Sequence, residues 1–169
     1  MKALVIRTAR PRWQPAWRQA LREGLVAGSL GSLLSTALLA AAGRRQAGSL
    51  VAPTNAVSHW LWGDASLRED GPSWRYTGLG YLTHHLAAVF WATLHAGLMG
   101  RRPGAGTLPA ALLGGIATSA TAAAIDYTLV PKRLTPGFEH RVSTGAMVAA
   151  FAALAVGMAV GSLLMRERD

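Results

Sequence analysis

The sequence predicts an all-α integral membrane protein, a four-helix bundle with a short interfacial helix in the first outer loop. Four stretches of 20 or more residues contain no Lys, Arg, Asp or Glu apart from one aspartate. Each stretch is longer than the roughly 18 apolar residues that predict a transmembrane helix. A soluble bundle would need a charged stripe on every helix, and these stretches have none. The predicted spans are residues 24–43, 77–100, 103–130 and 142–165.

Composition narrows the class further. A chain of 169 residues is too short for four spans and a separate soluble module, so we expect a basic amphipathic cytoplasmic tail over 1–23 and one transmembrane domain over 24–169. The absence of cysteine excludes disulfides, thiolate metal sites and cysteine nucleophiles. The net charge of +9 comes from basic residues that flank the spans, which is typical of topology signals, and we expect no nucleic-acid partner.

The distribution of basic residues predicts the orientation. Ten Lys and Arg residues lie on the side of both termini and seven on the other side, so both termini are expected in the cytoplasm. A cleaved signal peptide is the competing interpretation of the first span, because Ala40 and Ala42 resemble a cleavage site. The long basic region, and an apolar run beyond the usual signal core of about 7–15 residues, disfavour cleavage.

The basic tail ends in a predicted interfacial helix. Trp13, Trp17 and Leu21 recur at helical spacing, and tryptophan favours the depth of the lipid headgroups. Arg18 and Arg22 would reach the headgroups from the same helix. We expect this helix to lead into the first span; the alternative is a helix that docks a partner.

Small residues recur at every fourth position in the first and fourth spans, and such positions share one helix face. In lipid, small faces let helix backbones approach closely. We expect these faces to pack within the chain. The alternative is a homodimer through the Gly28/Ser32 face or the Gly157/Gly161 face, with the lipid bilayer as the surrounding partner.

The loops add two shorter predictions. In the first loop, residues 52–64 predict a short helix on the outer membrane surface. Thr54 or Asn55 is its predicted N-cap, and Gly63 its predicted end. In the third loop, Thr135 is the predicted N-cap of the fourth span.

Ionisable residues are expected to gather at one side of the membrane, because alternate ends of consecutive spans stay together. The outer ends of the second and third spans meet there with the first and third loops. Nine residues form this predicted polar cluster, which is the candidate functional site: His59, His84, His85, Asp126, Tyr127, Arg133, Glu139, His140 and Arg141.

Asp126 is the one carboxylate within the predicted spans. A charged Asp costs about 2.5–3.5 kcal/mol at the centre of a membrane helix and less near its end. The favoured interpretation is an ion pair with Arg133 or Arg141 that joins the third and fourth spans. The alternative is a proton or cation site.

The histidines of the second span are expected to form hydrogen bonds between helices or to water. His95 lies deep in the membrane, eleven residues beyond His84 and on the same face, about 16 Å away. A metal site built from His84, His85, Asp126 and His140 is the alternative, although no spacing matches a ligand motif. Haem is less favoured, because the other three spans contain no histidine for a second axial ligand.

A resemblance covers most of the chain and rests on four strings: residues 58–64 (SHWLWGD), 82–85 (LTHH), 126–133 (DYTLVPKR) and 135–141 (TPGFEHR). These strings resemble those of small uncharacterised four-span bacterial inner-membrane proteins. The resemblance implies a bacterial inner-membrane location and the same architecture. It implies no activity and no cofactor.

We expect a polytopic inner-membrane protein of structural or accessory type. The sequence contains no nucleophile elbow, phosphate loop or metalloprotease motif, so it predicts no reaction. The first alternative is a carrier for protons, ions or a small solute that uses Asp126 and the His84/His95 face. The second is a metal- or haem-binding redox protein.

Overall fold

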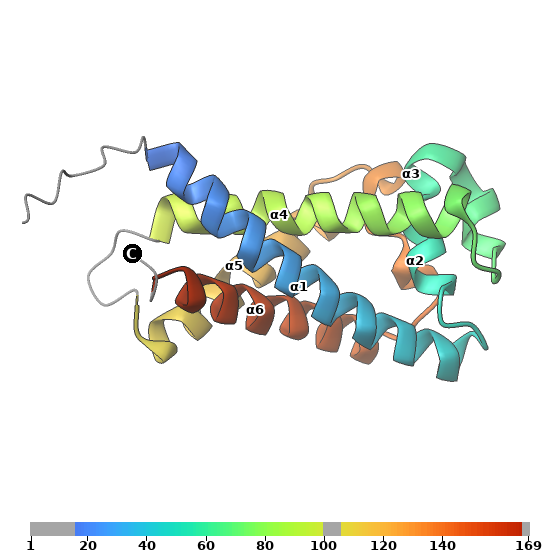
Figure 1. The fold of residues 1–169 in the computed structure, drawn as a ribbon. Coiled ribbons are helices and arrows are strands. Elements are labelled where there is room, and N and C mark those ends of the chain that lie inside the picture. The colour runs from blue at the N-terminus through green and yellow to red at the C-terminus, as the bar shows by residue number, and fades with distance from the viewer. Residues whose placement is uncertain (1–15, 100–105, 167–169) are drawn as a thin grey trace, which may run out of the picture.

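The described part of the chain is helical, which confirms the all-α prediction. The computed structural model describes residues 16–99 and 106–166, and it contains no strand within these ranges. Figure 1 shows the long helices running alongside one another in an elongated molecule. These helices are α1 (Ala16–Gln46), α4 (Leu79–Met99), α5 (Leu108–Thr128) and α6 (Thr144–Arg166).

Shorter elements gather at the end of the molecule where α1 stops and α6 starts (Figure 1). We call this end the cap. The start of α1 and the end of α6 lie at the opposite end. The cap consists of α2 (Ala52–Val57), α3 (His59–Trp62), the 3-10 turns η1 (Gly63–Arg68), η3 (Lys132–Leu134) and η4 (Phe138–His140), and the π-helical turn η2 (Trp74–Gly78).

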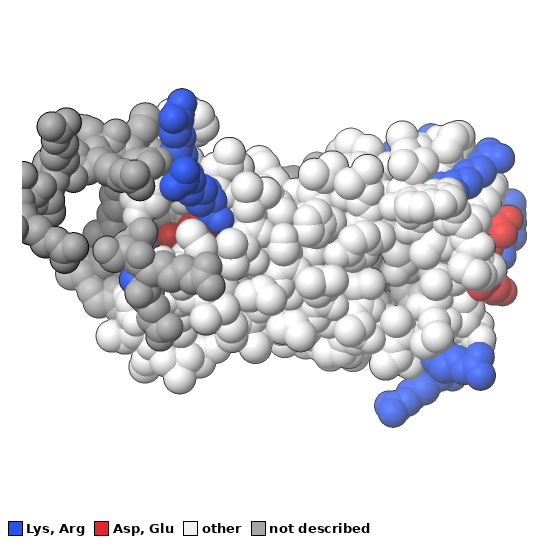
Figure 2. Space-filling view, in the orientation of Figure 1, with Lys and Arg blue, Asp and Glu red and all other residues white. Residues whose placement is uncertain are grey.

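Three of the long helices, α1, α5 and α6, are long and apolar enough to cross a membrane. On the face shown in Figure 2, an uncharged band separates two ends that carry the Lys, Arg, Asp and Glu side chains. Together these features indicate a membrane protein. The remaining long helix, α4, is not among them, and it carries three histidines. Hydropathy alone therefore supports three of the four predicted spans.

The central helix is α1, which packs along both α4 and α6, while α5 packs mainly against α6 and less closely against α4. Glycine permits the close approach: a Cβ on Gly157 of α6 would lie 2.4 Å from the Cα of Gly31 in α1. A Cβ on Gly28 would lie 2.5 Å from the α4 backbone. Ser32 and Gly161 are buried beside these contacts. Both small-residue faces are therefore used inside one chain, and a homodimer through them stays a prediction.

The long helices turn small residues inward and large apolar residues outward. Ala27, Ala88 and Ala92 are buried, together with Leu154 and Met158, in a core between α1, α4 and α6. A soluble helix would bury its apolar stripe instead of exposing it. The exposed stripe on α4 recurs every four residues and consists of Leu82, Leu86, Phe90, Leu94 and Leu98.

One of two predicted helix starts differs from the structure. The predicted interfacial helix leads into the first span from Trp17 onward, because α1 begins at Ala16. Trp13 lies outside the described residues. The prediction of Thr135 as the N-cap of the fourth span is wrong, since α6 begins at Thr144, close to the predicted span boundary at residue 142. Gly137, with a φ of 90°, turns the chain away from a helical path between them.

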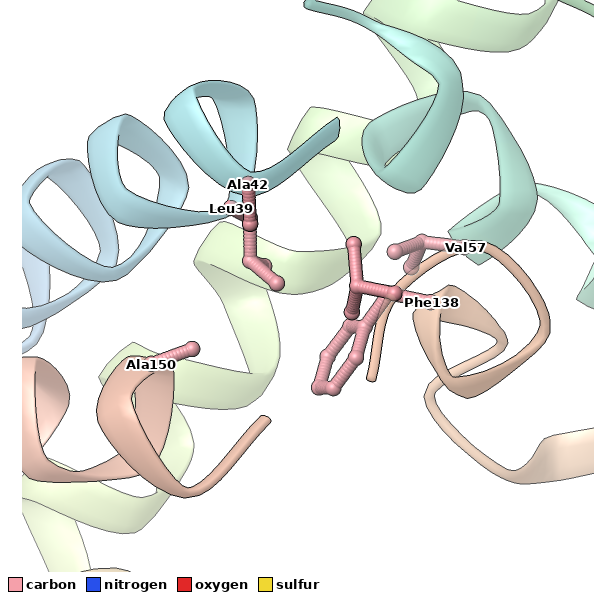
Figure 3. Close-up of a cluster of buried hydrophobic side chains, with 6 residues drawn as sticks. Leu39, Ala42, Val57, Phe138 and Ala150 are labelled. Atoms are coloured by element: carbon pink, nitrogen blue, oxygen red, sulfur yellow. The ribbon is translucent and has the colours of Figure 1, made fainter. Parts of the chain in front are cut away.

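The first loop forms two short helices instead of one. Val51 is the N-cap of α2, so the prediction of Thr54 or Asn55 is wrong, whereas Gly63 ends α3 as predicted. Every residue of α2 is buried, so this helix is enclosed by the protein and does not lie on its surface. A Cβ on Gly80 of α4 would lie 2.0 Å from the Thr54 carbonyl oxygen, so glycine makes room for α2. Figure 3 shows the apolar core at this junction, which contains Leu39, Ala42, Val57, Phe138, Val142 and Ala150.

Candidate functional site

The structure divides the predicted site residues into separate groups, and the first group joins α4 to α1. His84 Nε2 lies 2.8 Å from Ser35 Oγ. His85 Nδ1 lies 2.8 Å from Ser32 Oγ, and its ring stacks on Tyr81 with centroids 5.7 Å apart. Hydrogen bonds of this kind are the polar contacts that hold membrane helices together. The favoured interpretation of these two histidines, bonding between helices, matches this geometry.

The second group lines a groove of about 590 Å³ in the cap, which we call the outer groove. Glu139 lines this groove and accepts two hydrogen bonds. Its Oε1 accepts from Thr135 Oγ1 at 2.7 Å, and its Oε2 accepts from the Tyr127 hydroxyl at 3.3 Å. The ring of buried His59 lies 2.9 Å from the Ala56 carbonyl oxygen. The other predicted residues that line the outer groove are Arg133 and His140.

Arg141 lies outside both groups. Its guanidinium donates to the Leu67 carbonyl oxygen at 2.6 Å and forms an ion pair with Asp70, which joins the start of α6 to the first loop. Asp126 makes no hydrogen bond or ion pair with any described residue. The predicted pairing of Asp126 with Arg133 or Arg141 is therefore wrong, because one arginine lines the outer groove and the other is held by the first loop.

The four candidate metal ligands do not gather. Among residues 16–99 and 106–166, no three His, Asp or Glu side chains lie close enough together to hold a metal ion. His84 and His85 are neighbours in sequence, but they bond to different serines of α1. His140 lines the outer groove, and Asp126 lines a different cavity.

That second cavity lies between α4 and α5 and has a volume of about 530 Å³. We call it the lateral cleft. Asp126 and His84 are its ionisable residues, and Ser35 of α1 is a further polar one. The cap covers one end of it with Trp60 and Phe138, and the Trp60 indole nitrogen donates to the third loop at 2.7 Å. The main apolar residues of its walls are Leu86, Phe90, Trp91, Ile125, Phe151 and Leu154.

The lateral cleft exists because α4 and α5 are each held by other helices. The histidine–serine bonds hold α4 on α1. On the other side, a Cβ on Gly115 of α5 would lie 2.4 Å from the Ala155 carbonyl oxygen of α6. Ser119 adds a hydrogen bond of 2.6 Å to the Phe151 carbonyl oxygen. The two helices therefore diverge from each other and leave space between them.

The lateral cleft opens sideways. Leu86 and Phe90 line it and are 57% and 56% exposed, so its mouth lies among the outward-facing residues of α4. These residues belong to the apolar stripe of α4. A molecule dissolved in lipid would reach the cleft through this mouth.

His95 forms a hydrogen bond between helices, which is the contact expected of the histidines in the second span. It is buried, and its Nδ1 lies 2.8 Å from Thr118 Oγ1, so it joins α4 to α5. A Cβ on Gly114 would lie 2.6 Å from the His95 ring, so glycine makes room for the imidazole. His95 does not line the lateral cleft, and it bonds to a different helix from His84.

Sequence reasoning missed several residues that shape the lateral cleft. Ser35, Trp91 and Phe151 lie inside the predicted spans, where nothing in their spacing separates them from ordinary packing residues. Phe138 lies in a loop whose helical turn was not anticipated. The serines of the first span were the one available indication, because buried hydroxyls require partners and the second span offers histidines.

Comparison with known proteins adds no relative. No protein-family model, curated protein or solved structure that was compared with the chain matches it. The resemblance to bacterial inner-membrane proteins stays a prediction, and the lateral cleft and outer groove are interpreted from their own geometry.

Proposed function

We propose that the chain is a polytopic protein of a bacterial inner membrane, with α4 as a membrane span beside α1, α5 and α6 and with both termini in the cytoplasm. Each of the three histidines that lower the hydropathy of α4 bonds to a neighbouring helix, and the outward stripe of α4 is apolar. Its 21 residues can cross a hydrocarbon core of about 30 Å at about 1.5 Å per residue. The excess of Lys and Arg on the side of the termini supports the orientation.

Single-cysteine variants test whether α4 crosses the membrane, since the chain has no cysteine of its own. Gly71→Cys and Gly106→Cys place exposed thiols on either side of α4 along the chain. We expect a membrane-impermeant maleimide to label Gly71→Cys in spheroplasts, and Gly106→Cys only after permeabilisation. Labelling of both variants from the same side would show that α4 does not cross the membrane. The reverse pattern would contradict the orientation alone.

We infer an accessory function, binding rather than catalysis, in which the lateral cleft receives the apolar body of a membrane-soluble ligand. The cleft itself carries this inference. Its volume of about 530 Å³ falls within the range of about 300–1,000 Å³ that is typical of small-molecule sites. Its mouth lies in the apolar stripe, so the ligand need not pass through water. A carrier for protons, ions or a small solute, and a metal- or haem-binding redox protein, stay the alternatives.

Filling the lateral cleft tests this function. Ala87→Phe adds a phenyl group to the cleft wall, and Ala152→Phe adds the same group at an exposed position of α6 outside the cleft. We expect Ala87→Phe to weaken binding of the neutral dye N-phenyl-1-naphthylamine about tenfold, and Ala152→Phe to leave it unchanged. The measurement is dye fluorescence in protein-loaded nanodiscs above that of empty ones. Equal binding by both variants and the natural chain would contradict the proposal.

A further inference from the structure

Two ionisable side chains line the lateral cleft, and one of them has no partner in the described protein. His84 is bonded to Ser35 through Nε2, and its ring lies 6.5 Å from that of Phe138. Asp126 is half-buried near the end of α5 and makes no hydrogen bond or ion pair with any described residue. No Lys or Arg of the described chain lines the cleft. A carboxylate thus lines a site to which no described lysine or arginine contributes.

The remaining walls of the cleft suit an organic cation. The rings of Phe90 and Trp91 lie 5.4 Å apart, and those of Phe138 and Phe151 lie 6.1 Å apart. The electron-rich faces of aromatic rings attract organic cations, most strongly where water is excluded. A carboxylate left unpaired at membrane depth is costly, and a bound cation would remove much of that cost. An anion would meet Asp126 with no lysine or arginine in the cleft lining to compensate.

We propose that the ligand of the lateral cleft is an organic cation with a bulky apolar body. This inference rests on the proposed function, because it names the ligand class of the same site. The positive group lies beside Asp126 near the cap, and the apolar body extends past Phe90, Trp91 and Leu154 toward the middle of the uncharged band. The ligand enters from the lipid between α4 and α5.

Two lipophilic ions of opposite charge and nearly identical shape test the charge preference. Radiolabelled tetraphenylphosphonium and tetraphenylborate are titrated into the full chain in phosphatidylcholine nanodiscs, with empty nanodiscs subtracted. The natural chain is expected to bind the cation at least about tenfold more tightly than the anion. No preference, or a preference for the anion, would overturn the proposal without requiring any variant.

A pair of matched variants then assigns the preference to one carboxylate. Asp126→Asn is expected to weaken tetraphenylphosphonium binding about tenfold. Asp64→Asn makes the same chemical change at an exposed position in the outer groove and is expected to leave binding unchanged. Because Asp126 forms no ion pair with the described residues, Asp126→Asn should unfold at the same temperature as the natural chain. Equal loss in both variants would overturn the proposal.

Binding of the neutral dye distinguishes the proposed ligand class from the proposed function on which it rests. If Asp126→Asn keeps dye binding while losing the cation, both proposals are supported. If Ala87→Phe leaves dye binding unchanged, the cleft is not the ligand site. That result contradicts the proposed function itself, whatever the charge preference of the protein. Repeating the titration in nanodiscs of a neutral glycolipid, which has no ammonium group, identifies the source of the cation. Unchanged affinity indicates a free organic cation, and tighter affinity than in phosphatidylcholine indicates competition by the ammonium headgroup of a bilayer lipid.

Discussion

Gly157→Ala is expected to lower the free energy of unfolding in detergent by about 2 kcal/mol. The added methyl group would lie 2.4 Å from the Cα and 2.5 Å from the nitrogen of Gly31. Both atoms belong to the backbone of α1, so no side-chain rotation can relieve the contact. The substitution must therefore push α6 away from α1, along the longest helix–helix contact of the described chain. Unfolding by denaturant, followed by tryptophan fluorescence, measures the change.

The same helix offers a matched control. Gly145 also lies in α6, and a Cβ placed there meets no atom within 4 Å. Alanine is a better helix former than glycine by up to about 1 kcal/mol, so Gly145→Ala should leave the stability unchanged or raise it. A loss of stability in both variants would attribute the effect to glycine itself. No loss in Gly157→Ala would contradict the close contact between α1 and α6.

Asn55→Ala is expected to destabilise the protein by about 3 kcal/mol, because a fully buried amide forms three hydrogen bonds in the cap. Its Nδ2 donates to the carbonyl oxygens of Glu69 at 3.0 Å and Gly71 at 2.9 Å. Its Oδ1 accepts from the Thr77 hydroxyl at 2.6 Å. Alanine would remove all three hydrogen bonds, and each contributes about 1 kcal/mol to stability.

The loss should be local as well as global, since these bonds tether the segment from η1 to η2 onto α2. We expect limited proteolysis to cut residues 67–73 faster in Asn55→Ala than in the natural chain. Gln46→Ala is the matched control, because its exposed amide forms one hydrogen bond, to the Ser143 backbone nitrogen at 2.6 Å. It should cost less than about 1 kcal/mol and leave that segment protected. Equal cleavage in both variants would show that Asn55 does not hold the cap.

Local composition was sufficient to predict the long helices but not the residues at which helices begin and end. The uncharged runs predicted the positions of the long helices, because hydropathy and the absence of charge are properties of the segment itself. The predicted N-cap of α6 at Thr135 was wrong because Gly137 adopts a left-handed backbone conformation that depends on its surroundings. The first loop was misjudged for a similar reason, since α2 is buried in space that Gly43 and Gly80 leave open for it.

The candidate site was predicted as a set of residues and not as an arrangement. His84, Asp126 and Glu139 were all singled out from their positions near the outer ends of spans or in loops. The structure assigns them to different surroundings: His84 to a serine of α1, Asp126 to the lateral cleft and Glu139 to the outer groove. An arginine close in sequence to Asp126 suggested an ion pair, but Arg133 lines the outer groove whereas Asp126 lines the lateral cleft.

The sequence by itself determined the helical class and the long apolar helices, because both depend on composition within one segment. Only the tertiary structure decided the partner of each polar side chain. The bonds from His85 to Ser32 and from His84 to Ser35 join residues 53 and 49 positions apart. Such pairs depend on how each helix is rotated about its axis, and that rotation is set where glycines let two backbones meet. The same rotation leaves α4 and α5 apart, opens the lateral cleft and places Asp126 in its wall, where no described residue forms a hydrogen bond or ion pair with it.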